Sequence, residues 1–72
     1  MKRLAQVAIV SGSRLRELRQ EYGLLQSDLA VRLGVHSTTI SNWERERWPL
    51  PEAAFVLIRA AVAGARRLDL GR

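Results

Sequence analysis

The stretch Gln26 to Glu44, QSDLAVRLGVHSTTISNWE, has the apolar spacing of two short helices separated by a glycine turn. The apolar or small residues that form its buried side are Leu29, Ala30, Leu33, Val35, Ile40 and Trp43. Gly34 can adopt the left-handed backbone conformation that commonly ends a helix. We therefore predict a helix over Gln26 to Leu33, a tight turn, and a second helix that begins at Ser37.

The second of these helices has a continuous polar face. At roughly 100° per residue, an arc of about 140° holds the following residues: Ser37, Thr38, Ser41, Asn42 and Arg45. Their hydroxyls, amide and guanidinium can hydrogen-bond to base edges and phosphates, and the arc contains no carboxylate that would repel DNA. Such a face can also be an ordinary solvated helix surface. The flanking apolar pattern favours contact with DNA.

Two further motifs accompany the helix pair, L-R-E-L-R-x-x-x-G-L at residues 15–24 and T-I-S-x-W-E at residues 39–44. With them, the chain from Leu15 to Leu57 resembles the phage repressor and Cro-like helix-turn-helix family, often called XRE-type. The resemblance implies an all-α fold, a small bundle of four to five helices with a helix-turn-helix. It also implies that the partner is double-stranded DNA.

The polar arc and the resemblance together predict which side chains contact DNA. Base contacts are expected at Ser37, Thr38, Ser41 and Asn42. Phosphate contacts are expected at Gln26, His36, Arg45 and Arg47. The resemblance further implies that Arg19 and Glu44 form a structural ion pair that ties the first helix to the third.

Three positions depart from the family pattern. Leu25 stands where the family usually has a Thr or Ser N-cap, which forfeits on the order of 1 kcal/mol unless Ser27 caps the helix instead. His36 replaces the usual Ser or Thr cap of the recognition helix. Glu46 replaces a common Gly, so we predict that the recognition helix continues from Ser37 to about Arg47.

The rest of the chain is predicted to complete one domain over residues 1–72. The segment Leu4 to Val10 is rich in β-branched side chains, so residues 1–12 are expected to form a short extended arm. A helical core over residues 13–67 begins with a helix from Ser13 that stops at Gly23. It ends with a helix from Pro51 to about Arg67, because proline suits the first turn of a helix. Residues 68–72 form a tail.

The last predicted helix has an apolar stripe that is broad for contact with one neighbouring helix. Part of the stripe is therefore expected to face a second subunit, with these interface residues: Phe55, Leu57, Ile58, Arg59 and Val62. A wide contact within the monomer core would explain the same stripe. The arm from Leu4 to Val10 is an alternative surface for pairing, because it could form a strand with its mate.

Size and composition limit the functions that can be expected of this chain. The chain has 72 residues and a net charge of +5, which suits a protein that neutralises phosphates. It has no Cys and one His, so neither disulfides, a metal site nor a cofactor is expected. The longest apolar run, Ala53 to Ile58, is far shorter than the roughly 18 residues of a membrane span. A cytoplasmic location is expected.

The sequence therefore predicts a sequence-specific regulator of transcription. We expect a homodimeric repressor of its own or a neighbouring operon, bound to an inverted-repeat operator. An enzyme is not expected, since no Gly-rich phosphate loop or paired metal ligands are present. An antitoxin that binds a toxin, or a protein-binding adaptor with the same fold, stays open as an alternative.

Overall fold

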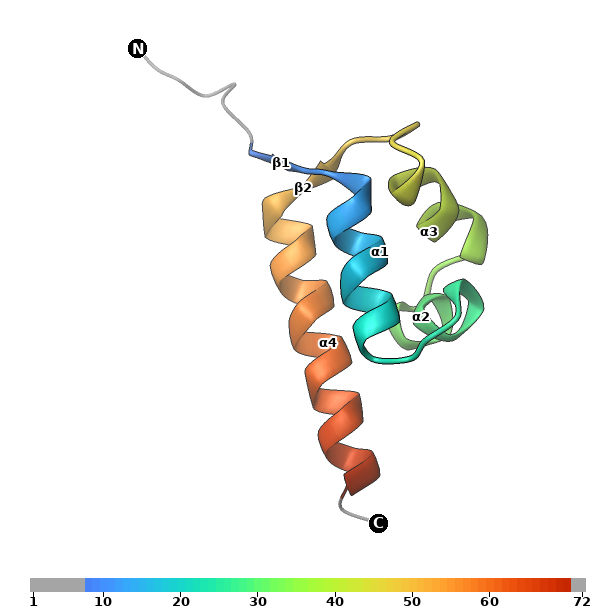
Figure 1. Cartoon of the computed structure of the whole chain (residues 1–72), viewed down its shortest axis with the longest axis vertical. Helices are drawn as coiled ribbons and strands as arrows, with labels where there is room; N and C mark the ends of the chain where they lie inside the picture. The colour runs from blue at the N-terminus through green and yellow to red at the C-terminus, as the bar shows by residue number, and fades with distance from the viewer. Residues whose placement is uncertain (1–7, 71–72) are drawn as a thin grey trace.

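The computed structural model describes residues 8–70, and for residues 65–70 it describes the backbone alone. The described chain is mostly helical, with these elements in order: β1 (Ile9–Val10), α1 (Gly12–Glu21), α2 (Gln26–Leu33), α3 (Ser37–Glu44), β2 (Leu50–Pro51) and α4 (Glu52–Leu70) (Figure 1). The predicted helical bundle with a helix-turn-helix is confirmed. The small sheet was not predicted.

The sheet joins the beginning of the described chain to the segment between α3 and α4. β1 and β2 are antiparallel, with Ile9 opposite Pro51 and Val10 opposite Leu50. The Glu52 N–H also donates a hydrogen bond to the Ala8 carbonyl over 2.9 Å. This part of the predicted arm is therefore extended, but it pairs with its own chain. The remainder of the arm, from Leu4 to residue 7, lies outside the described residues.

The helix ends show how the chain satisfies its terminal backbone groups. Ser11 caps α1, since its Oγ accepts the Arg14 N–H over 3.4 Å, and the helix starts one residue earlier than predicted. The boundaries of α2 agree with the prediction, and Gly34 ends it in the left-handed conformation (φ 70°). At the other end of α2, the Asp28 carboxylate accepts the Leu25 N–H over 2.9 Å. Asp28 is the third residue of the helix and thus supplies one half of a capping box, whereas no side chain at Leu25 caps the first-turn N–H groups.

The recognition helix is shorter than predicted. It ends at Glu44, Arg45 is its C-cap, and Arg47 lies beyond it. Glu46 stops the helix because it adopts a left-handed backbone (φ 62°) despite its side chain. Its carboxylate accepts the Gly12 N–H over 2.8 Å, a contact that glycine could not make. This hydrogen bond helps offset the cost of about 1 to 2 kcal/mol of that backbone conformation.

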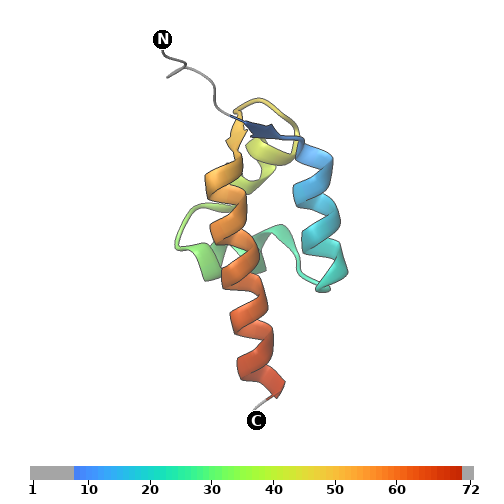
Figure 2. The ribbon, with the colours of Figure 1, turned by 90° about the vertical axis from the view of Figure 1, so that its left-hand side faces the viewer.

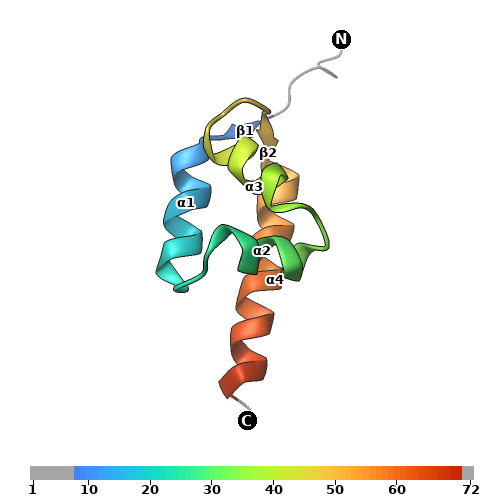
Figure 3. The same ribbon diagram turned by 90° about the vertical axis from the view of Figure 1, so that its right-hand side faces the viewer.

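The core lies where α4 and the strands meet the other helices (Figures 2 and 3). Its buried apolar side chains are Val10, Leu15, Leu29, Ala30, Ile40, Leu50, Phe55, Ile58 and Val62. Each of the described elements thus contributes at least one of them. Around them lie partly buried apolar residues: Leu18, Tyr22, Leu24, Leu33, Trp43 and Ala54.

This core corrects part of the predicted dimer interface. Phe55, Ile58 and Val62 are at most 4% exposed, because they fill the space between α4 and the rest of the domain. They therefore cannot also lie on a surface for a second subunit. Leu57 and Arg59 are exposed, and their place in a dimer interface stays a prediction.

The last helix is longer than predicted. α4 begins at Glu52, one residue after the expected start, and its backbone is helical to Leu70, which includes the first residues of the predicted tail. In the described part of the chain, no helix is long and apolar enough to cross a membrane.

Candidate DNA-binding surface

In Figure 1, α2 and α3 lie together at the right of the domain and α4 lies at the left, where it packs against α2. On α3, Ile40 is fully buried and Trp43 is half-buried against the core, so the opposite face is turned outward. Ser37 and Thr38 are exposed on that face. The first turn of the recognition helix is therefore open to a ligand.

The other residues that were predicted to contact DNA differ in how exposed they are. Ser41 and Asn42 are half-buried, so a partner would reach them only by close approach to the helix. His36 is the exposed N-cap of α3, and its side chain makes no capping hydrogen bond. Arg45 and Arg47 are exposed at the other end of the helix, and the described residues form no ion pair with them. Their positive charges are available to an anion.

An ion pair fixes α3 to α1. The Arg19 Nε lies 2.7 Å from the Glu44 Oε2, and its Nη2 donates to the Glu44 Oε1 over 3.1 Å. The Arg19 Nη1 also donates to the Leu24 carbonyl over 2.9 Å. The side chain of Glu44 is 1% exposed and that of Arg19 is 12% exposed. The predicted Arg19–Glu44 pair is thus confirmed, with the bidentate geometry that makes such pairs strong.

Glu44 has two further partners that the sequence did not predict. The Gln26 Nε2 donates to the Glu44 Oε1 over 3.1 Å, and the Arg16 Nε lies 3.6 Å from the same oxygen. One buried carboxylate therefore connects α1, α2 and α3. Gln26 begins α2 and is half-buried, with its amide nitrogen on Glu44. Its contact with a phosphate stays a prediction.

These contacts determine the ionisation of the pair. Burial alone would raise the pKa of Glu44, but the hydrogen bonds from Arg19 and Gln26 and the charges of Arg19 and Arg16 outweigh it. The pKa of Glu44 is therefore lower than usual. The hydrogen bond to Glu44 raises the pKa of Arg19 above its already high value. Both groups are charged at neutral pH.

A pH dependence of stability follows from Glu44. Its pKa is lower in the folded than in the unfolded chain, so its stabilising effect is complete above the ordinary pKa of 4.5 and is lost as the pH falls below it. We expect thermal unfolding to show a steeper loss of stability below this pH in the parent chain than in Glu44→Gln. Equal slopes would show that Glu44 ionises alike in the folded and unfolded chain.

The chemical groups of this surface are those that the outward face of α3 presents. Among the described residues, no group of three His, Cys, Asp or Glu side chains could hold a metal ion. What the outward face of α3 presents is a set of hydroxyls, an amide, an imidazole and guanidinium groups on a short helix. These are groups that bind phosphates and base edges in the major groove.

A helix pair of this kind, with a polar second helix fixed from behind, is typical of DNA-binding proteins. Residues 15–60 match the family model described as helix-turn-helix (HTH_3), which covers more than half of the chain. The chain belongs to this Cro/C1-type (XRE) family, whose domain binds DNA and is typically not an enzyme. No curated protein and no solved structure matches the chain.

Proposed function

We propose that the protein is a sequence-specific regulator of transcription that represses its own or a neighbouring operon from the cytoplasm. The observation that carries this proposal is the polar outward face of α3, which is exposed at Ser37, Thr38 and Arg45, while Glu44 at the end of the helix is bound to α1 and α2. A helix held in this way can enter the major groove without rearrangement of the domain. Repression then follows from occupying promoter DNA.

A dimer on an inverted repeat is the form of binding that we propose. One recognition helix reads only a few base pairs, whereas two helices about 34 Å apart reach successive major grooves on one side of the duplex. Two sets of contacts multiply both affinity and specificity. The net charge of +5 adds a favourable interaction with any DNA, which weakens as salt increases.

A substitution of Asn42 tests whether its side chain reads the DNA sequence by direct contact with a base. An Asn amide can pair with adenine through two hydrogen bonds, and such a contact discriminates between bases by about 1 to 3 kcal/mol. We expect Asn42→Ala to lose preference at one base pair in each half-site. The measurement is selection from a pool of randomised duplexes, with the enriched sequences compared between the parent chain and the variant.

Arg45→Ala is the matched comparison, because Arg45 follows Asn42 by one turn and is exposed at the end of α3. If Arg45 contacts phosphate, its loss weakens binding to every sequence alike and makes the dependence of affinity on salt shallower. An unchanged base preference in Asn42→Ala would remove Asn42 from the readout. If the parent chain enriches no sequence at all, the proposal of specific regulation is wrong.

A further inference from the structure

The end of α3 has a helix-stop motif with a glutamate in the position where glycine is usual. The Glu46 N–H donates to the Trp43 carbonyl over 3.1 Å. The Arg47 N–H donates to the Asn42 carbonyl over 2.9 Å. These two hydrogen bonds form a Schellman motif, in which the residue after the C-cap has a left-handed backbone. Glycine adopts that backbone at no steric cost, whereas the Cβ of Glu46 (φ 62°) opposes it. A contact outside α3 is therefore needed to hold Glu46 in this conformation.

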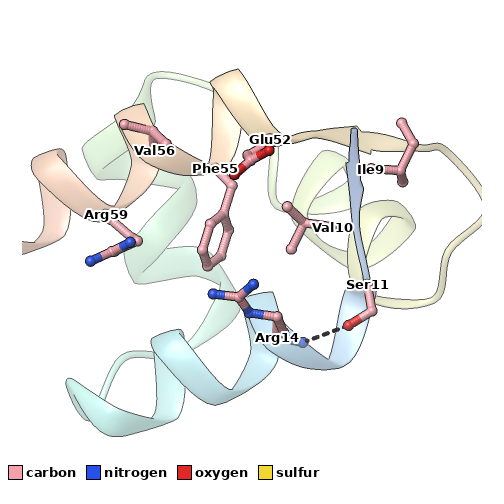
Figure 4. A pocket seen from close by; sticks show the side chains of 8 residues that line it. All are labelled: Ile9, Val10, Ser11, Arg14, Glu52, Phe55, Val56 and Arg59. Carbon is pink, nitrogen blue, oxygen red and sulfur yellow. Dashed lines mark hydrogen bonds between the residues drawn. The ribbon is translucent and has the colours of Figure 1, made fainter. Parts of the chain in front are cut away.

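The contact that holds Glu46 is with the first turn of α1. The N–H groups of a first turn have no partners inside their own helix. Ser11 accepts one of them, the Arg14 N–H, as Figure 4 shows. The Glu46 carboxylate accepts another, the Gly12 N–H, over 2.8 Å. A carboxylate is a favourable partner there, because the N-terminal end of a helix carries a partial positive charge.

This hydrogen bond is the one contact that restrains the Glu46 side chain. Among the described residues, the Glu46 carboxylate has no other hydrogen bond and no ion pair. Gly12 in turn lies close to the end of α3, since a Cβ at this position would overlap the Glu44 carbonyl oxygen. Loss of the acceptor at residue 46 would therefore leave nothing to oppose a return of its backbone to helical angles.

We propose that Glu46 is a positioning residue for DNA binding, because its hydrogen bond to α1 ends α3 and thereby sets the direction in which Arg47 leaves the helix. This inference rests on the proposed function and deepens it. Without the bond, α3 would continue to about Arg47. Each residue added to a helix turns the chain by about 100° and advances it by about 1.5 Å. The exposed Arg47 side chain would then no longer reach the phosphate that it is proposed to contact.

The same hydrogen bond directs an acid away from the proposed DNA contacts. Glu46 lies between Arg45 and Arg47, the two arginines that are proposed to contact phosphate. A carboxylate turned toward the duplex between them would repel the phosphates. Its bond to the Gly12 N–H instead turns it toward α1, and neither arginine forms an ion pair with a described residue.

Three substitutions of Glu46 separate the hydrogen bond from the charge. Glu46→Ala removes the acceptor but keeps a Cβ, and alanine favours a longer helix. Glu46→Gln keeps an acceptor oxygen, and Glu46→Gly adopts the left-handed backbone without help. We expect Glu46→Ala to lower the affinity for an enriched duplex about tenfold, because Arg47 must be reordered on binding. The other two variants should stay within about threefold of the parent affinity.

An effect of charge alone would give a different order. Each of the three variants removes one negative charge from a chain of net charge +5, so all three would bind DNA alike and more tightly than the parent chain. Glu17→Gln is the matched control, because Glu17 is exposed on α1 and lines a hollow between α1 and α4. It removes the same charge far from the end of α3, so its affinity measures the effect of charge by itself.

Two further measurements test whether Glu46 acts through the backbone at the end of α3. The α-carbon chemical shift of Arg47, measured by NMR in the free protein, should move toward the helical value in Glu46→Ala and stay near the parent value in Glu46→Gly. Arg47→Ala should weaken DNA binding by the parent chain. It should weaken binding by Glu46→Ala much less, because that contact is already lost there.

Thermal unfolding checks that each variant is folded at the temperature of the binding measurements. If Glu46→Ala is unfolded, Glu46→Ser repeats the test, because serine is too short to reach Gly12. Equal affinities of the three Glu46 variants, or an unchanged Arg47 shift in Glu46→Ala, would overturn the inference.

The affinity of the parent chain separates this inference from the proposed function. If the parent chain binds an enriched duplex and Glu46→Ala binds it as tightly, the role of Glu46 is wrong and the proposed function stands. If the parent chain binds no duplex, the proposed function is wrong, and with it any role of Glu46 in DNA binding.

Discussion

Arg19→Met is expected to lower the free energy of unfolding by about 3 to 5 kcal/mol, because it leaves the carboxylate of Glu44 buried without its main partner. A small domain has only about 5 to 15 kcal/mol of stability, so much of the variant should be unfolded at moderate temperature. The remaining contacts from Gln26 and Arg16 favour the lower end of this range. Chemical denaturation measures the difference.

The double variant Arg19→Met with Glu44→Leu is the control for this prediction. It removes both charges, so no unpaired ion is left in the interior, and it should be more stable than Arg19→Met alone. A double variant no more stable than the single variant would mean that Glu44 is hydrated once Arg19 is gone. The penalty for an isolated buried charge would then not apply.

Gly12→Ala is expected to destabilise the domain by about 3 kcal/mol, at the upper end for overpacking. A Cβ at this position would overlap the carbonyl oxygen of Glu44 and would lie 2.6 Å from that of Trp43. These are backbone atoms at the end of α3, so they cannot move aside as a flexible side chain could. The hydrogen bond between the Gly12 N–H and Glu46 would be strained as well.

Gly64→Ala is the matched control, since it also replaces a helical glycine. A Cβ at Gly64 meets no atom within 4 Å, and alanine is the better helix former by about 1 kcal/mol. Thermal unfolding should therefore show a loss of stability for Gly12→Ala and none for Gly64→Ala. Similar midpoints for the two variants would show that α1 and α3 can separate at little cost.

Local patterns sufficed to predict the helix-turn-helix. Gly34 and the apolar spacing placed the boundaries of α2, because these depend on residues close in the sequence. The Arg19–Glu44 pair came from the family resemblance. In contrast, α3 ends because Glu46 adopts a left-handed backbone. The Glu46 carboxylate accepts a hydrogen bond from the N–H of Gly12, which is 34 residues away in the sequence. A rule based on glycine alone misses such a stop.

The last helix shows a second limit of sequence patterns. Apolar residues surround most of α4, so its periodicity does not say which side packs on the domain. The positions of the other helices decide this, and they bury Phe55, Ile58 and Val62 and leave Val56 and Leu57 outside. The strand β2 was missed for a similar reason, since Leu50 and Pro51 form a strand only because Ile9 and Val10 lie beside them.

The three-way attachment of Glu44 has a consequence for the thermodynamics of recognition. Because Arg19 and Gln26 already hold the end of α3, the helix has little conformational freedom left to lose when it meets a ligand. Association then avoids most of the entropic cost of ordering a flexible reading element. The binding free energy at this surface is accordingly set by the fit of the exposed side chains and by released counterions.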